Sequence, residues 1–103
     1  MRIANWNLER VLPRQRRAAD IRESLEAVTA DLYVLTETHE ALIPRPEFFG
    51  VFSGDPDRHS DAGERWTAIW AACPPQRLDA YVSDPARCVA ARLADTPIGE
   101  MVV

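Results

Sequence analysis

The feature that most constrains the fold is a short apolar run in the first half of the chain. Residues 32–35 read Leu-Tyr-Val-Leu, and the polar triplet Thr-Glu-Thr follows at once at 36–38. A nearly continuous apolar run of this length is typical of a strand that other elements cover on both faces. The sequence therefore predicts a central strand over residues 31–38 whose carboxyl end carries polar side chains.

The segments before this run complete a strand–helix–strand unit. Residues 2–8 are short, apolar-leaning and aromatic, which favours another strand. Apolar residues then recur at spacings of three and four from Ala18 to Val28 and define one face of a helix. Pro13 breaks the strand and suits the first turn of that helix, which we expect over roughly residues 14–29.

The second half of the chain has the pattern of an antiparallel meander. Short strand candidates lie at 48–53, 65–72, 77–82, 88–93 and 99–103, and Pro-rich or polar segments separate most of them. Together with the strand–helix–strand opening, this pattern predicts an α/β (α+β) fold with a mixed or antiparallel sheet. Trp66 and Trp70 lie four residues apart on one candidate strand. We expect both to pack in the core, with base stacking as the alternative.

The composition is that of a single globular domain spanning residues 1–103. Hydrophobic residues make up 47% and charged residues 27% of the chain, as in soluble globular proteins. The net charge of −4 gives no general attraction to nucleic acid. No run resembles a signal peptide or a membrane helix, which predicts a cytoplasmic protein. We expect Cys73 and Cys88 to be small buried side chains rather than disulfide partners or zinc ligands.

The last residues of the chain, Met101, Val102 and Val103, stand in the middle of an apolar strand signal. Complete domains more often finish in polar, frayed residues. We therefore expect the natural domain to be truncated here and to continue beyond residue 103. The alternative is a small protein whose last strand docks in the sheet.

Polar side chains that could carry chemistry come at the ends of the first two predicted strands. Asn7 ends the first strand and Glu37 ends the central one. If the strands are neighbours, both side chains emerge at one edge of the sheet, where ligand sites of α/β proteins form. A carboxylate there suits Mg²⁺ or Mn²⁺, and an amide can orient water or phosphate. Glu9 adds a second carboxylate, and the alternative is that these residues simply form turns.

Two segments resemble motifs of a known family. Residues 3–9, Ile-Ala-Asn-Trp-Asn-Leu-Glu, resemble the first motif of the endonuclease/exonuclease/phosphatase (DNase I-like) superfamily, a strand that ends in Trp-Asn-x-acidic. Residues 31–39 resemble its second motif, in which Asp and an apolar run precede Glu-Thr and a basic residue. The intervening helix also fits in length. The resemblance is specific over residues 1–39 and loose over the rest.

The resemblance implies a fold, a reaction and a set of site residues. The fold would be part of a two-layer β-sandwich flanked by helices. The reaction would be hydrolysis of a phosphodiester or phosphomonoester with Mg²⁺ or Mn²⁺. Glu37 would bind the metal, Asn7 would belong to the active site, Glu9 would lie near the metal, and His39 would lie near the substrate. The substrate could be a nucleic acid, a sugar phosphate or a lipid headgroup.

A basic patch after the first motif offers a further substrate contact. It consists of Arg10, Arg14, Arg16 and Arg17. Guanidinium groups match the geometry of phosphate oxygens, which makes Arg10 a candidate for binding substrate. The alternative is the solvated start of a helix.

The chain departs from the family in the later motifs. Neither the Gly-Asp-x-Asn motif nor the Ser-Asp-His motif occurs in the 103 residues. Residues 54–57, Gly-Asp-Pro-Asp, lack the Asn and come too early, and we interpret His59 as a surface histidine. We therefore expect the N-terminal part of a phosphoesterase that is inactive by itself. The alternative is a non-catalytic interaction module that self-associates through the exposed face of an incomplete sandwich.

Overall fold

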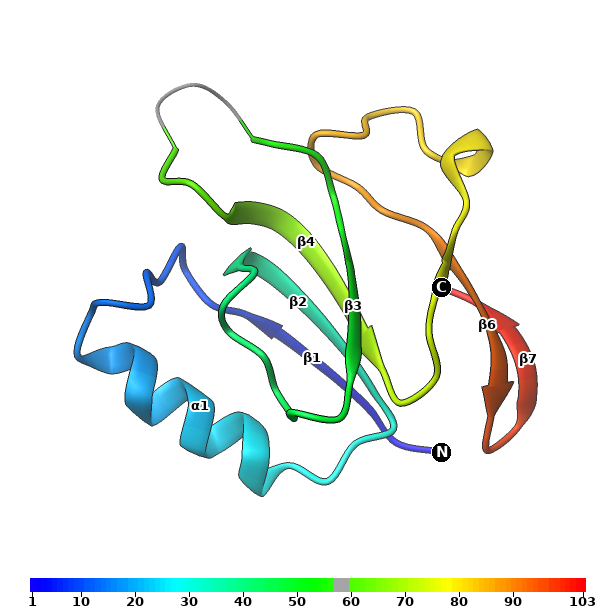
Figure 1. Ribbon diagram of the computed structural model, residues 1–103, viewed down its shortest axis with the longest axis horizontal. Coiled ribbons are helices and arrows are strands. Elements are labelled where there is room, and N and C mark those ends of the chain that lie inside the picture. The colour runs from blue at the N-terminus through cyan, green and yellow to red at the C-terminus, as the bar shows by residue number, and fades with distance from the viewer. Residues whose placement is uncertain (57–59) are drawn as a thin grey trace.

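The chain folds into two sheets and one α-helix, and the computed structural model describes residues 1–56 and 60–103 (Figure 1). The described elements are β1 (Ile3–Asn7), α1 (Arg17–Ala27), β2 (Leu32–His39), β3 (Phe49–Phe52), β4 (Glu64–Ala71), β5 (Gln76–Arg77), the short 3-10 helix η1 (Asp79–Tyr81), β6 (Ala91–Thr96) and β7 (Gly99–Val102). This confirms the predicted α+β class with mixed and antiparallel sheets. The predictions for Asp57 and His59 fall outside the described residues.

The larger sheet places the predicted central strand between two neighbours. Its strand order is β1-β2-β4-β3, and the smaller sheet has the order β5-β6-β7. β1 and β2 are parallel, with α1 as the connection between them, whereas β4 is antiparallel to both β2 and β3. The β5-β6-β7 sheet is antiparallel throughout, as the meander pattern predicts.

Apolar side chains bury the larger sheet on both faces. On one face, α1 packs Ala18, Ile21 and Leu25 into a core that includes Tyr33 and Leu35 of β2. On the other face, the smaller sheet covers β2 and β4 through a second core that contains Leu32, Ile69, Ala71, Ala91 and Leu93. The alternation along β2, with neighbouring side chains in different cores, follows from the two-residue period of a strand.

Tyr33 joins the central strand to the end of the helix. Its side chain is fully buried, and its hydroxyl donates to the carbonyl oxygens of Leu25, at 3.1 Å, and Val28. The last carbonyl groups of a helix have no partner within the helix. The phenol therefore satisfies groups that would otherwise be left without a partner next to the core.

Local turns account for the places where the predicted elements were wrong. The helix begins at Arg17 instead of residue 14 because Gln15 closes a turn, accepting from the Leu12 N–H through its side chain at 3.1 Å. The predicted strand at 77–82 keeps only Arg77, and η1 takes the place of its middle part, residues 79–81. β6 begins at Ala91 instead of residue 88 because the backbone N–H groups of Arg87 and Cys88 fold back onto Asp84.

The structure also bears on the predictions that the two cysteines are buried and unpaired and that the chain has no membrane helix. Both cysteines are free thiols. Cys73 is only partly buried, against the second core, and Cys88 is exposed, so the prediction of buried side chains holds in part for Cys73 and was wrong for Cys88. Within the described residues, no helix has the length and apolar character needed to span a membrane.

The tyrosines provide a test of the strand–helix junction. We expect Tyr33→Phe to lower the free energy of unfolding by about 1–2 kcal/mol, because it leaves buried carbonyl oxygens without a donor. Urea denaturation followed by circular dichroism measures the change. Tyr81→Phe is the matched control, because Tyr81 is 78% exposed and its loss should change stability by less than about 0.5 kcal/mol. Equal effects of the two substitutions would contradict the role given to Tyr33.

Candidate functional site

Asn7 and Glu37 meet at the carboxyl edge of the parallel strand pair. Asn7 is the last residue of β1 and pairs in register with Thr36 of β2. Its side-chain Nδ2 donates to Glu37 Oε1 at 3.2 Å. The predicted proximity of these two side chains is therefore confirmed, and it follows from the parallel arrangement of β1 and β2.

The backbone at this edge is strained. Glu9, Arg10 and Glu37 have φ angles of 52°, 56° and 48°, and they are the only non-glycine residues with positive φ in the described part of the chain. The left-handed conformation costs a residue with a Cβ atom about 1–2 kcal/mol. Such strain concentrates at functional sites, where the surrounding structure holds it in place.

Hydrogen bonds across the edge hold the strained residues. The Leu8 N–H donates to the Thr36 carbonyl at 2.9 Å, which extends the pairing of β1 and β2. The Arg10 N–H donates to the Glu37 carbonyl, also at 2.9 Å. The side-chain Oδ1 of Asn7 accepts from the Glu9 N–H at 2.8 Å. Asn7 thus fixes the turn with its oxygen while its nitrogen holds the Glu37 carboxylate.

The positive φ of Glu37 also redirects its side chain. β2 and β4 pair Thr36 with Thr67 and Thr38 with Arg65, and Glu37 is left out of the pairing. The regular alternation of side chains is interrupted at such a point. The carboxylate consequently reaches the Asn7 side chain, and Oε2 makes no hydrogen bond within the described part of the chain.

Glu9 lies beside this pair but engages the helix. Its carboxylate Oε2 is 3.4 Å from Arg17 Nη1, and Arg17 Nη2 donates to the Glu9 carbonyl at 2.8 Å. The Glu9 side chain is 80% exposed. The backbone of Glu9 therefore belongs to the site through its bond to Asn7, whereas its carboxylate is bound to the start of α1.

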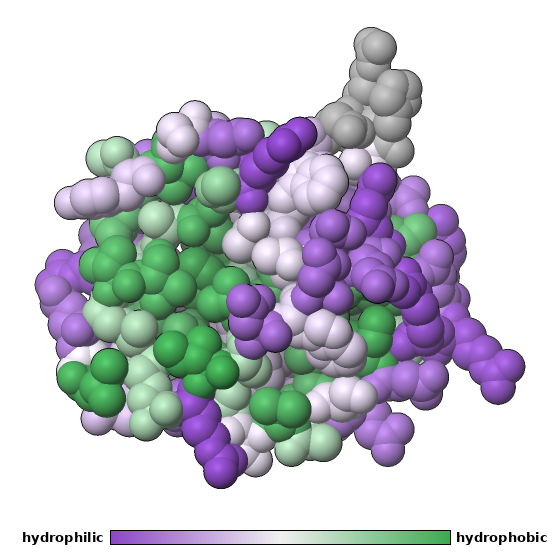
Figure 2. Space-filling view, turned by 180° about the vertical axis from the view of Figure 1, so that it is seen from behind, coloured by the Kyte–Doolittle hydropathy of each residue, from purple (hydrophilic) through white to green (hydrophobic). Residues whose placement is uncertain are grey.

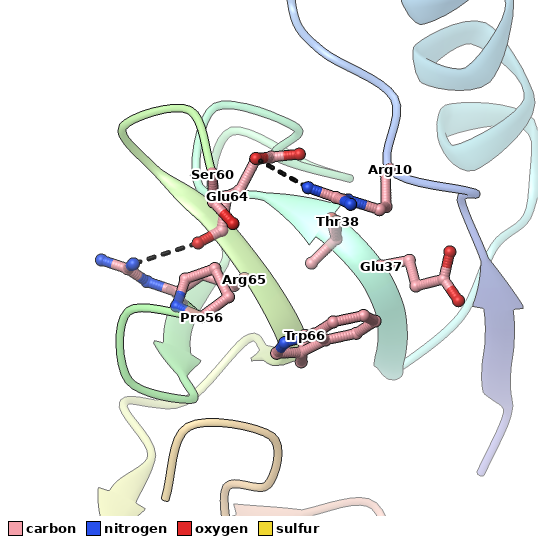
Figure 3. A pocket seen from close by; sticks show the side chains of 8 residues that line it. All are labelled: Arg10, Glu37, Thr38, Pro56, Ser60, Glu64, Arg65 and Trp66. Carbon is pink, nitrogen blue, oxygen red and sulfur yellow. Dashed lines mark hydrogen bonds and ion pairs between the residues drawn. The ribbon is translucent and has the colours of Figure 1, made fainter. Parts of the chain in front are cut away.

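A pocket opens between this edge and the beginning of β4 (Figure 3). Its lining residues are Arg10, Glu37, Thr38, Pro56, Ser60, Glu64, Arg65 and Trp66. Arg10 Nη2 spans the pocket to Glu64 Oε2 at 3.4 Å, and the Asp61 N–H donates to the same oxygen at 2.6 Å. Sequence reasoning missed Glu64, because a charged residue at the end of a polar loop gives no sign that it becomes buried.

Thr38 and Arg65 also line the pocket, and they differ in whether their polar groups have partners. The Thr38 hydroxyl is buried and has no hydrogen-bond partner within the described residues. Leaving such a group without a partner costs about 1–3 kcal/mol. Arg65 binds Glu40, at 2.5 Å, and also Asp55. Burial lowers the pKa of Arg65, but these two carboxylates outweigh it and leave the pKa above its ordinary value.

His39 holds the loop before β4 and does not line the pocket. Its Nδ1 accepts from the Ala41 N–H at 3.0 Å, and its Nε2 lies 2.8 Å from the Ala62 carbonyl oxygen. The ring also packs against Gly63, where a Cβ atom would lie 2.6 Å from His39 Cε1. Both ring nitrogens therefore engage the backbone, and the structure does not bring His39 to the site as a free substrate contact.

The two tryptophans of β4 have different surroundings. Trp70 belongs to the core under α1 and makes an edge-to-face contact with Phe52 at 5.3 Å between ring centroids. Trp66 is only partly buried, lies in neither hydrophobic core of the described residues, and lines the pocket beside Glu37. The prediction of core packing is therefore confirmed for Trp70 and wrong for Trp66.

The donor set at the edge fits a magnesium ion bound in its usual manner. Mg²⁺ commonly binds through one or two carboxylates and keeps water or phosphate oxygens as its other ligands. Glu37 offers such a carboxylate, with one oxygen held by Asn7 and the other free of hydrogen bonds within the described chain. The described residues contain no cluster of three or more His, Cys, Asp or Glu side chains placed to hold a metal by themselves.

The two asparagines of β1 test the role of Asn7 in holding this edge. Asn7→Ala removes the bonds to Glu37 and to the Glu9 N–H, and we expect it to lower the free energy of unfolding by about 1–2 kcal/mol. Asn5→Ala is the control, because the Asn5 side chain makes no hydrogen bond within the described chain, and its effect should stay below about 0.5 kcal/mol. Chemical denaturation measures both. A neutral Asn7→Ala would show that the turn holds without the amide.

No protein-family model, curated protein or solved structure matches this chain. Membership of the endonuclease/exonuclease/phosphatase superfamily therefore stays a prediction that rests on the motifs at residues 3–9 and 31–39.

Proposed function

We propose that the edge formed by Asn7 and Glu37 is the metal-binding part of a phosphoesterase site. The observation that carries the proposal is the contact of the Asn7 amide with the Glu37 carboxylate at the carboxyl ends of two parallel strands. The strained backbone at Glu9, Arg10 and Glu37 supports it, because an unstrained turn would satisfy a purely structural role.

Each residue of the edge has a distinct part in this proposal. Glu37 holds Mg²⁺ or Mn²⁺, and Asn7 fixes the orientation of that carboxylate by donating to one of its oxygens. Arg10 points into the pocket and binds a phosphate oxygen of the substrate. The Glu9 carboxylate, once it is released from Arg17, accepts a hydrogen bond from a water molecule bound to the metal. When bound, the metal would neutralise charge on the phosphate oxygens.

The 103 residues supply only part of such a catalytic set. They contain neither of the later family motifs, and His39 is engaged by the backbone at both ring nitrogens. Catalytic groups that act together lose orders of magnitude in rate when members are missing. We therefore expect this chain to bind metal weakly and to hydrolyse phosphate esters very slowly or not at all.

A metal titration tests the proposal directly. With Mg²⁺ or Mn²⁺ at ten times a dissociation constant, bound metal should raise the free energy of unfolding by about 1.4 kcal/mol. Thermal denaturation measured over a metal series follows this effect. Glu37→Gln keeps an oxygen that can accept from Asn7 but removes the charge, and it should abolish the stabilisation.

Glu26→Gln is the matched control, because Glu26 is an exposed carboxylate on α1 and should leave the metal response unchanged. A metal response that survives in Glu37→Gln would rule out the assignment of Glu37. A parallel assay of bis(p-nitrophenyl) phosphate with Mg²⁺ should give little or no turnover. Rapid turnover by the 103-residue chain would contradict the expectation of inactivity.

We infer a second candidate function, self-association, from the free edge of β1. β1 lies at the edge of the larger sheet, and Ile3 and Trp6 are exposed on it. Its sequence contains no charge and no proline, the residues that usually protect an edge strand from pairing. Figure 2, which shows the molecule from behind, also shows a broad apolar area on that face. The partner that fits this edge is β1 of a second copy, in an antiparallel pair.

Proline at the edge tests this pairing. The Leu8 N–H faces β2, so the N–H groups of Asn5 and Asn7 should face outward, because alternate residues of a parallel strand bond the same neighbour. Asn5→Pro should therefore convert a dimer into a monomer without breaking the bonds to β2, while Asn5→Ala should remain a dimer. Sedimentation over a concentration series measures the assembly state. A wild-type chain that stays monomeric at high concentration would refute the pairing.

A further inference from the structure

Trp6 is a large aromatic side chain that β1 exposes at the free edge of the larger sheet. It is 41% exposed. Ala4 packs against the core under α1, and Trp6 lies on the same face of β1 because side chains alternate along a strand. On that face Trp6 borders a shallow depression together with Ile21 and Arg17 of α1. Exposed tryptophans at such places are common anchors of protein–protein interfaces.

A groove lies on the same flank, between the start of β1 and the end of α1. Its apolar lining comes from Ile3, Ala4, Ala27, Val28 and Ala30. Most of these side chains are small, and Val28 is 48% exposed. The volume of the groove is about 380 Å³, which lies in the range of pockets that hold small ligands. An indole ring can therefore enter it.

We propose that Trp6 of each copy fills this groove of the other copy when two β1 strands pair. The contact rests on the proposed self-association and specifies its register. β1 has five residues, and its outward-facing backbone groups belong to Ile3, Asn5 and Asn7. An antiparallel pair in which all five residues overlap is centred on Asn5. In that register, Trp6 of one copy lies directly opposite Ala4 of the other copy, beside the groove.

Size and charge both favour this register. The Cα atoms of such an opposing pair lie about 4.5 Å apart, so a large ring fits best across from a small side chain such as Ala4. A shift by two residues would set Trp6 against another Trp6 or against Arg2. Arg2 precedes β1 and the exposed Glu9 follows it, so antiparallel strands place each cation near the acid of the other copy. A parallel pair would bring like charges together.

Two substitutions test the contact from its two sides. Sedimentation over a concentration series measures the dimer dissociation constant. Trp6→Ala should raise it by at least about 30-fold, the factor expected from losing one buried aromatic anchor. Val28→Glu keeps the ring but places a charge in the groove, and it should weaken the dimer as well. Tyr81→Ala removes an exposed aromatic side chain outside β1 and α1 and should leave the constant unchanged.

Disulfide cross-linking tests the register. The background carries Cys73→Ser and Cys88→Ser, since both native thiols are free. Asn5→Cys lies opposite itself in the proposed pair, with Cα atoms about 5.5 Å apart, and mild oxidation should give a covalent dimer. Ile3→Cys lies opposite Asn7, too far from its own copy for a disulfide, and should stay uncoupled. Coupling of Ile3→Cys in place of Asn5→Cys would overturn the register.

The outcomes separate this contact from the self-association on which it rests. A wild-type chain that stays monomeric at high concentration would overturn both. A wild-type dimer that Asn5→Pro dissociates, but that Trp6→Ala and Val28→Glu leave equally stable, would keep the pairing of β1 strands and overturn the Trp6 contact alone. Neither measurement involves a metal, so both results are independent of the phosphoesterase proposal.

Discussion

Burial of β2 on both faces is the constraint from which the rest of the structure follows. Its side chains alternate between the core under α1 and the core under the smaller sheet. A strand enclosed in this way can present polar groups only where it leaves the cores, at its carboxyl end. Because β1 runs parallel to it, the carboxyl end of β1 lies at the same edge, and Asn7 and Glu37 meet there.

The strain at this edge and the hydrogen bonds that hold it belong together. Each left-handed residue costs about 1–2 kcal/mol, and three occur within one turn and one strand end. The Asn7 side chain and the Arg10–Glu37 backbone bond keep that conformation against an easier one. The rigid packing of β2 makes this possible, since a strand with freedom to shift would relax the φ of Glu37 and return its side chain to regular alternation.

The sequence allowed the contacts within the β1–α1–β2 unit to be predicted, but not those that depend on the pairing of distant strands. Apolar periodicity identified β2 and α1, and the strand–helix–strand order made β1 and β2 neighbours, which is enough to bring Asn7 to Glu37. The burial of Glu64 and the position of Trp66 could not be predicted, because both depend on the pairing of β4 with a strand about 30 residues earlier. The left-handed residues could not be predicted either, because Glu and Arg have no preference for positive φ.

The two arginines of the pocket differ in what holds them, and the difference decides which one can meet a phosphate. Arg65 is bound by Glu40 and Asp55 and its side chain is 15% exposed, so withdrawing it would leave two carboxylates without a partner. Arg10 is 53% exposed and has a single ion pair, with Glu64 at 3.4 Å. Glu64 itself is buried, so a phosphate oxygen that takes Arg10 away leaves a buried carboxylate without its charged partner, which is costlier than breaking an exposed pair. Glu64 keeps the Asp61 N–H when that happens, so the exchange leaves the start of β4 in place.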